Sequence, residues 1–172
     1  MRAYKSERKA EELLGGKHGL CYYIPKKTVV RMRLGKKMFC KVPVIHSLVF
    51  VYATKQDIVD FKRYVCNELQ FVTWKSDGIQ QYMIVPEEEM KNFITLCNQR
   101  EQEVTFFRPE DICIEKGKRV RVHGGVFDGV EGHFVKVARK RGRRLVVIIP
   151  NILAASVEAE IECLEILQEH SM

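Results

Sequence analysis

Residues 120–135 read VRVHGGVFDGVEGHFV, and this stretch decides how the C-terminal third of the chain folds. Two short runs of alternating apolar and polar residues flank four glycines, Gly124, Gly125, Gly129 and Gly132. Sharp corners and close backbone contacts admit glycine more readily than any residue with a Cβ. With the later run RLVVII (144–149), the pattern predicts a small β-barrel of the SH3-like kind.

Composition indicates a globular protein. Of the 172 residues, 46% are hydrophobic and 30% are charged, which argues against a disordered or fibrous chain. The first twenty residues carry no apolar signal segment, and VPVIHSLVFVYA (42–53) is too short and too interrupted to span a membrane. The six cysteines form no C-x-x-C pair. We therefore expect reduced thiols and a cytoplasmic protein without a membrane span.

The net charge of +7 is unevenly distributed. Residues 117–150 hold nine Lys/Arg and two acidic residues, whereas residues 151–172 hold five Glu and no Lys/Arg. Such polarity favours an acidic partner near the basic stretch: RNA, DNA or an acidic protein surface. The run ARKRGRR is interpreted either as a solvated hairpin tip or as a phosphate contact, and both readings stay open. Its basic residues are Arg139, Lys140, Arg141, Arg143 and Arg144.

The N-terminal part alternates helical and strand patterns. SERKAEELL (6–14) has helical spacing and stops at two glycines, and Thr54 with Asp57 is a capping pair for a helix over 55–65. A third helix begins near Pro86, and β-branched and aromatic runs fill the intervals. The pattern predicts the α+β class, with an antiparallel sheet covered by helices.

The domain boundary follows from a loss of periodicity. After the third helix, NQREQEVTFFRPEDICIEKG (98–117) mixes charges and contains a proline. We expect an α+β domain over residues 1–98, a linker over 99–115 and the SH3-like barrel over 116–172.

Two known modules resemble this chain. GKRVRVHGGVFDGVEGHFVKV (117–137) is similar to the KOW motif, with Val126 where the motif usually has proline. The motif positions fall on Gly117, Val120, Val122, Gly125, Phe127, Gly129 and Gly132. MRAYKSERKAEELL, IPKK, VPVIHSLVFVYA, FVTWKSDG and MIVPEEEMKNFI resemble, in order, the N-terminal domain of NusG-type transcription elongation factors. The chain is most similar to the NusG-like antiterminators of Bacteroides-type bacteria.

The resemblance implies a non-catalytic factor that rides on bacterial RNA polymerase. In the family, an apolar concavity on the N-terminal domain grips the coiled-coil tip of the polymerase clamp and suppresses pausing. The corresponding positions here are Tyr4, Ile45 and Leu48, and His46-Ser47 replaces the family's Pro-Gly. Ordinary core packing is the alternative reading for all three residues.

The same resemblance implies a second partner for the KOW domain. Phe127 corresponds to the loop aromatic that contacts termination factor Rho or a ribosomal small-subunit protein. A loop aromatic beside glycines can equally plug the barrel, so both roles stay open. Family members open with an aromatic pair in the first strand, whereas Met1-Arg2-Ala3-Tyr4 begins within it. We therefore expect that the true start lies upstream or that the first strand is truncated.

Other classes of protein fit less well. The glycine cluster lacks the Lys-[Ser/Thr] of a phosphate loop, and the histidines have no zinc-ligand spacing with the cysteines. We expect no enzyme activity, no cofactor and no metal, and we expect a monomer. The rival reading is an RNA-binding or ribosome-associated module that does not bind polymerase. LAASVEAEIECLEILQ (153–168) fits a strand that closes the barrel, and it also has helical spacing.

Overall fold

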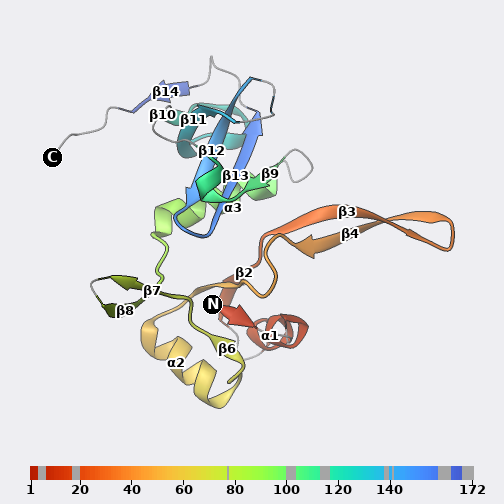
Figure 1. The fold of residues 1–172 in the computed structure, drawn as a ribbon, viewed down its shortest axis with the longest axis vertical. Helices are drawn as coiled ribbons and strands as arrows, with labels where there is room; N and C mark the ends of the chain where they lie inside the picture. Colours follow the sequence, from red (N-terminus) through yellow and green to blue (C-terminus); the bar gives the residue numbers. More distant parts are fainter. Residues whose placement is uncertain are drawn as a thin grey trace. The chain divides into compact units, whose positions relative to one another are not determined.

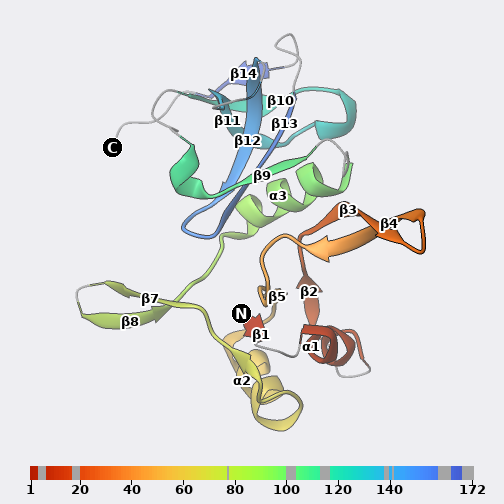
Figure 2. The ribbon, with the colours of Figure 1, turned by 45° about the vertical axis from the view of Figure 1, so that its right-hand side comes forward.

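The computed structural model separates the chain into two compact units, residues 1–84 and 85–172, which are described separately below. The structure describes residues 1–3, 7–16, 20–76, 78–99, 104–112, 117–137, 140, 142–158 and 164–167. Figures 1 and 2 show the elements of both units in two views.

The first unit combines helices with antiparallel strand pairs (Figure 1). The helices are α1 (Glu7–Leu14) and α2 (Lys55–Tyr64). The strand pairs are β1 (Arg2–Ala3) with β6 (Leu69–Gln70), β2 (Cys21–Tyr23) with β5 (Phe50–Tyr52), β3 (Lys26–Arg33) with β4 (Lys36–Pro43), and β7 (Thr73–Ser76) with β8 (Ile79–Tyr82). The antiparallel pairing was expected, but the described residues form four separate pairs instead of one continuous sheet. Pro25 after β2 and Pro43 at the end of β4 lack the amide donor that would extend the ladder.

Local sequence signals account for both helices of this unit. Thr54 is the N-cap of α2, and its hydroxyl oxygen accepts a hydrogen bond from the backbone N–H of Asp57 (3.2 Å). Ile58 and Phe61, one turn apart, form the buried face of α2. In α1, Ala10 and Leu14 are buried at the same spacing, and the helix ends before Gly15. These helices confirm the sequence prediction.

The core of the first unit gathers around the short strand β1. Ala3 is fully buried among α1, α2 and the residues that follow β4 and α2. The other buried members of this cluster are Ala10, Leu14, Val49, Phe61, Cys66 and Leu69. On one side β1 pairs with β6, and on the other Arg2 forms a bridge with Leu48. The backbone of β1 is therefore bonded on both edges.

The second unit is a six-stranded antiparallel sheet with a helix packed against it (Figure 2). The sheet order is β14-β10-β11-β12-β13-β9, and α3 (Glu87–Gln99) contacts β11, β12 and β13. The strands are β9 (Thr105–Phe107), β10 (Lys118–Val122), β11 (Glu131–Lys136), β12 (Arg143–Ile149), β13 (Leu153–Glu158) and β14 (Leu164–Ile166). Short 3-10 turns lie at η1 (Pro109–Asp111) and η3 (Gly125–Phe127). Closure of this sheet into an SH3-like barrel stays a prediction.

Two parts of the second unit differ from the expected layout. Residues 105–107, expected within the linker, form β9 and pair with β13, because the small Ala154 and Ala155 lie opposite Phe107 and Phe106. Helix α3, expected in the N-terminal domain, groups here with the second unit, and Phe93, Leu96 and Cys97 are buried. The expected domain bounds stay a prediction. The tail is extended where it is described, as β13 and β14, while residues 159–163 lie outside the described part.

The glycines of residues 120–135 serve two different purposes. Gly124, Gly125 and Gly129 have φ values of 78°, 70° and 78°, in the left-handed region that disfavours a Cβ. Gly132, inside β11, instead allows a close approach between strands. A Cβ at Gly132 would lie 2.6 Å from the carbonyl oxygen of Val146 in β12. Turn geometry and strand packing therefore both require glycine here.

Paired charges cross the sheet between β10, β11 and β14. Glu131 accepts hydrogen bonds from Arg119 (3.1 Å) and Arg121 (2.5 Å), and His123 lies 2.7 Å from Glu165. The hydrogen bond from Arg121 is the main cause that lowers the pKa of Glu131 below its ordinary value. The backbone N–H of Glu131 donates to Oδ1 of Asn92 on α3 (3.2 Å). Glu131 thus links three elements of this unit.

Replacing Gly132 should destabilise the second unit. In Gly132→Ala the new Cβ meets a backbone oxygen that cannot move without separating β11 from β12, so we expect a loss of about 3 kcal/mol in the free energy of unfolding. Gly142→Ala is the matched control, because open space surrounds its Cβ and only the φ of 71° is strained, at about 1 kcal/mol. Urea unfolding followed by far-UV circular dichroism measures both. Equal losses would refute the close-approach explanation.

Neutralising Glu131 should weaken the unit in a pH-dependent way. Because the folded pKa of Glu131 is lowered, its contribution is present above the unfolded pKa of about 4.3 and is lost as the pH falls through the folded pKa. The group is partly exposed, so we expect Glu131→Gln to cost about 0.5–1 kcal/mol at pH 7. Urea unfolding at pH 7 and below pH 4 checks this. The exposed Glu110→Gln is the control and should change little at either pH, and a Glu131→Gln deficit that persists in acid would contradict the assignment.

Candidate functional site

The segment 44–49, between β4 and β5, is the scaffold of the candidate site. Its backbone is fixed by the N–H of Val44 donating to the carbonyl of Pro25 (2.8 Å), and the N–H of Ala3 donating to the carbonyl of Ser47 (2.8 Å). The N–H of Val49 donates to the carbonyl of Met1 (2.9 Å). The segment is therefore held at both ends by backbone hydrogen bonds to β1 and to residues beside β1 and β3.

Ser47 turns this segment sharply. Its φ is 66°, in the left-handed region that favours glycine. In the pattern of the resembling family, a Pro-Gly pair stands where this chain has His46-Ser47. Ser47 thus adopts the conformation for which the family pattern places glycine. The turn directs the chain into the bridge that Leu48 forms with Arg2.

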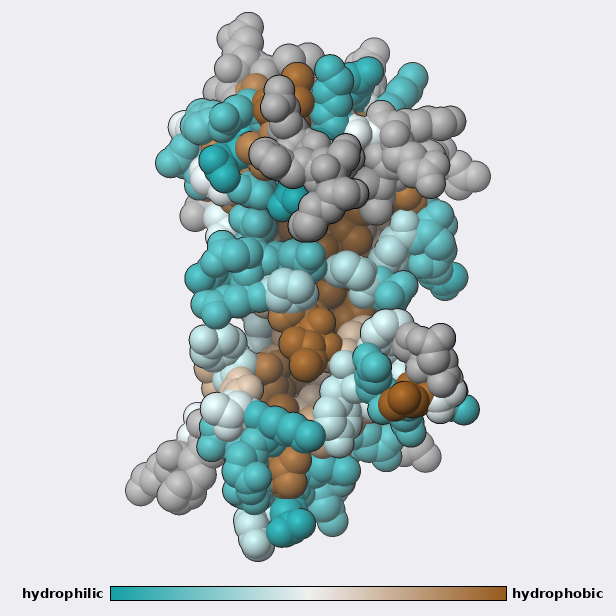
Figure 3. All heavy atoms as spheres, turned by 90° about the vertical axis from the view of Figure 1, so that its left-hand side faces the viewer, coloured by the Kyte–Doolittle hydropathy of each residue, from teal (hydrophilic) through white to brown (hydrophobic). Residues whose placement is uncertain are grey.

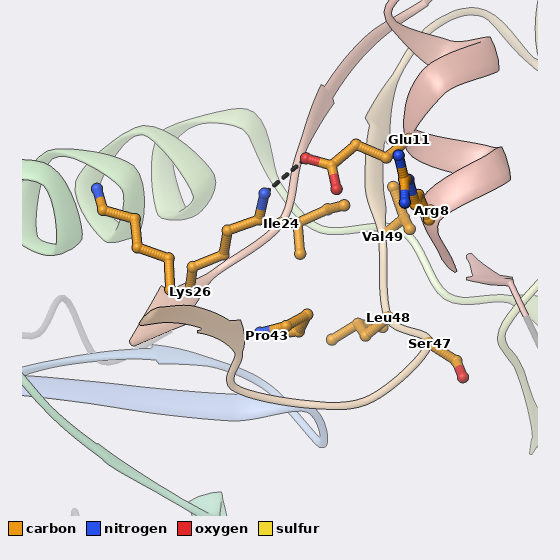
Figure 4. A pocket seen from close by; sticks show the side chains of 9 residues that line it. Arg8, Glu11, Ile24, Lys26, Pro43, Ser47, Leu48 and Val49 are labelled. Atoms are coloured by element: carbon orange, nitrogen blue, oxygen red, sulfur yellow. Dashed lines mark hydrogen bonds and ion pairs between the residues drawn. The ribbon is translucent and has the colours of Figure 1, made fainter. Parts of the chain in front are cut away.

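A pocket of about 180 Å³ lies beside this segment, among α1, β3, β4 and the residues after β2 (Figure 4). Its apolar lining comes from Ile24, Pro43, Leu48 and Val49. Its charged lining comes from Arg8, Glu11, Lys26 and Lys41. Ser47 completes it. The combination of an apolar lining with charged groups suits an apolar side chain of a protein partner better than a free ion.

The charged groups of the pocket are organised by one ion pair. Nζ of Lys26 lies 2.6 Å from Oε1 of Glu11, and both side chains are about one-third exposed (Figure 4). This pair joins α1 to the first residue of β3 across one side of the pocket. It therefore joins two walls of the pocket, while Arg8 pairs separately with Glu12 on α1 (3.0 Å).

The residues expected to contact polymerase are placed unequally. Leu48 lines the pocket, although only 4% of its surface is exposed, so it forms the floor. Ile45 is half-buried in the same segment, and its carbonyl accepts a hydrogen bond from the N–H of Leu48 (3.4 Å). Tyr4 lies outside the described residues. The structure therefore brings two of the three expected residues together.

Sequence reasoning missed most of the pocket lining. Ile24 comes from a different segment than Pro43 and Val49, and no spacing in the sequence links it to them. The available signal was local: Pro43 and Val49 lie in the same apolar run as Ile45 and Leu48. Figure 3 shows hydrophobic residues among hydrophilic ones on the face that it displays. The exposed large hydrophobic residues of the first unit include Phe39, Ile79 and Ile84.

The loop residue Phe127 is buried in the second unit. It ends η3 and is only 6% exposed, whereas its neighbour Val126 is 46% exposed. The N–H of Gly124 donates to Oδ1 of Asp128 (2.6 Å), which closes the loop around this turn. In this conformation Phe127 therefore packs inside the unit. Val126 is the apolar side chain of the loop that is exposed to solvent.

The basic run 139–144 does not act as one group. Lys140 and Arg143 are exposed, while Arg139 and Arg141 lie outside the described residues. Arg144 is only 4% exposed, and its guanidinium donates to Oγ of Ser156 (3.0 Å) and Oε1 of Glu158 (2.9 Å) on β13. Arg144 is therefore not part of a solvated hairpin tip. It lies in β12, and pairing with β13 brings polar partners to its side chain.

The described part of the chain lacks two features that would point to other functions. There, no group of three or more His, Cys, Asp or Glu side chains could hold a metal ion. Among the same residues, no helix has both the length and the apolar character needed to cross a membrane.

Comparison with known proteins agrees with the N-terminal resemblance. No curated protein matches the sequence. The family model described as "Transcription termination factor nusG" matches residues 2–94, which is more than half of the chain and includes the pocket-forming segments. The match ends before the glycine-rich stretch, so the KOW assignment stays a prediction. Because the match covers most of the chain, this protein belongs to the NusG family of transcription factors.

Proposed function

We propose that this protein is a transcription elongation and antitermination factor that binds RNA polymerase through its N-terminal unit. The observation that carries the proposal is the pocket with an apolar floor and charged walls, built on the segment that holds Ile45 and Leu48. Family membership supports a role in transcription, and this pocket is the feature in the matched region best suited to a protein partner.

The pocket would grip the partner by burying one apolar side chain. Leu48, Pro43 and Ile24 offer hydrocarbon surface, and removal of such surface from water is favourable at about 25 cal/mol per Å². Arg8 and the Lys26–Glu11 pair surround this surface with polar groups. An apolar centre with a polar rim is the usual composition of a protein interface. The clamp coiled-coil tip of polymerase is the partner that we infer for it.

We infer a second, separate partner for the C-terminal residues. The KOW-like stretch supports an SH3-like barrel over residues 116–172 that recruits Rho or a ribosomal small-subunit protein. Since Phe127 is buried, the contact that the family makes through this loop would fall to Val126 unless the loop rearranges. The proposed activity is binding alone, without catalysis, cofactor or metal, and RNA contact through Lys140 and Arg143 remains the rival explanation for the basic stretch.

A charge on the segment that carries the pocket floor should weaken polymerase binding. Ile45→Asp places a carboxylate on the half-buried residue three positions before Leu48, and we expect it to weaken binding to core RNA polymerase at least about 10-fold, a loss of about 1.4 kcal/mol or more. Ile79→Asp is the matched control: it is the same substitution, in the same unit, on the exposed strand β8. Fluorescence anisotropy with the labelled full chain measures both variants.

A salt series separates the polymerase reading from the RNA reading. Binding through a buried apolar contact should keep its affinity between 50 and 200 mM salt. The affinity of binding through phosphate contacts should instead fall on the order of 10³-fold or more over that range. The proposal fails if binding collapses with salt, if single-stranded RNA competes for it, and if Ile45→Asp behaves like Ile79→Asp. Leu48→Asp is less informative, because Leu48 also contributes to the core.

A further inference from the structure

The hairpin formed by β3 and β4 has two unlike faces. Residues that pair across an antiparallel ladder share a face, and successive residues of one strand alternate between the faces. The register sets Val30 opposite Phe39 and Met32 opposite Lys37, so these four side chains lie on one face. The face, called here the Phe39 face, consists of the exposed residues Thr28, Val30, Met32, Lys37, Phe39 and Lys41.

Apolar side chains occupy the centre of the Phe39 face. Val30, Met32 and Phe39 are 56%, 64% and 75% exposed. On the opposite face, by contrast, the pair of Val29 with Cys40 is half-buried. The hairpin therefore shields apolar side chains on one face and leaves a contiguous group of larger ones in solvent on the other. Contiguous exposed apolar surface is a mark of an interaction site.

Positive charge surrounds this apolar centre. Residues 26–41 hold seven Lys/Arg and no acidic residue. On β4, Lys37 and Lys41 stand two residues before and two residues after Phe39, on the same face. A second copy of this chain would bring seven further cations against the hairpin, so repulsion opposes self-association through it. The charge instead selects a partner that carries carboxylates or other anions.

The arrangement of the Phe39 face suits a protein better than a nucleic acid. An apolar centre with a charged rim is the usual composition of a protein interface, whereas a phosphate backbone offers no apolar surface to match it. The register also places Arg31, Arg33 and Lys36 on the opposite face, away from the apolar centre. Only part of the hairpin's charge thus borders this centre, as expected for the rim of a protein interface.

We propose that the Phe39 face binds an acidic amphipathic helix of a protein partner. Two paired strands with their side chains are about as wide as one α-helix, about 10 Å. Lys37 and Lys41 are four residues apart, about 14 Å, which lies between two and three turns of a helix. The helix buries its apolar stripe against Val30, Met32 and Phe39, and carboxylates two to three turns apart on one flank pair with the two lysines.

This inference goes beyond polymerase binding and does not depend on it. The pocket of the first unit reaches the hairpin only at its base, through Lys26, Lys41 and Pro43. Of these three, only Lys41 belongs to the Phe39 face, and the apolar centre of that face lies outside the pocket lining. The test uses the full chain without polymerase, so its outcome is separate from that of the polymerase experiment.

The probe is a fluorescently labelled peptide of leucine, glutamate and alanine, about 18 residues or five turns long. Its leucines follow the i, i+3, i+4, i+7 spacing and its glutamates flank that stripe. A control peptide has each leucine replaced by glutamine and keeps the same charge. Fluorescence anisotropy with the full chain should give a Kd of about 100 µM or tighter for the probe, and binding at least about tenfold weaker for the control peptide.

Two matched pairs of variants locate the binding face. Phe39→Ser removes apolar surface from the Phe39 face, whereas Met38→Ser removes it from the adjacent residue, 44% exposed, on the opposite face. Lys37→Glu reverses a charge on the Phe39 face, and Lys36→Glu makes the same change on the opposite face. We expect Phe39→Ser and Lys37→Glu each to weaken peptide binding at least about tenfold. Met38→Ser and Lys36→Glu should stay within about threefold of the wild type.

The contrary outcomes are equally definite. No binding of the probe, or equal effects within each pair of variants, would overturn the proposal, because a disturbed hairpin affects both faces alike. Equal binding of the two peptides would reveal a general site for polyanions, nucleic acid included. Ile45→Asp should leave peptide binding unchanged, and a loss confined to this variant would place the peptide in the pocket instead. The bound probe should also gain helical circular dichroism, and a bound probe without it would refute the helical partner.

Discussion

The backbone pairing of Arg2 and Ala3 is the constraint on which the first unit depends. This short strand is bonded to β6 on one edge and reaches Leu48 and Ser47 on the other. Ala3 is fully buried, so a larger side chain would push apart the helices that pack around it. Because unpaired buried backbone groups are costly, the strand and its two neighbours hold their positions together. The floor of the pocket, Leu48, is a direct product of that pairing.

In the second unit, the main constraint is the close approach of neighbouring strands. Gly132 lets β11 lie against the carbonyl of Val146, and Ala154 with Ala155 lets β9 lie along β13 with Phe106 and Phe107 opposite. Small residues stand where backbones meet, and the branched residues of β12 fill the interior. The charges of Arg144 and Glu131 are then satisfied across the strands that this packing brings together.

Signals that act within one element could be predicted from the sequence. The Thr54 cap and the buried spacing of Ile58 and Phe61 each depend on neighbours a few residues away. The family could also be inferred, since its motifs are read in chain order. The lining of the pocket could not, because only the tertiary fold brings Ile24 together with Pro43 and Val49.

The burial of Arg144 shows the same limit at a single residue. A run of arginines and glycine reads as a solvated tip, yet Arg144 is already the second residue of β12, where it lies opposite Glu158. The strand register decides which cation of the run turns inward, and register depends on β13, more than ten residues away. Composition alone does not predict which cation turns inward. Nor does it predict that residues 105–107 pair with β13 in the sheet.

The isolation of the β3–β4 ribbon also has a kinetic consequence. Each of its strands has a single bonded neighbour, and most of its side chains are exposed, so little apolar burial opposes opening. A two-stranded hairpin with so little support is only marginally stable in water. Its amide protons will therefore exchange with solvent through local fraying, long before those of β1 or β12. The hydrogen-bonded states of these segments thus differ in lifetime. The pairing of β1 and β12 persists, whereas the β3–β4 hairpin opens and re-forms on the microsecond scale typical of hairpins.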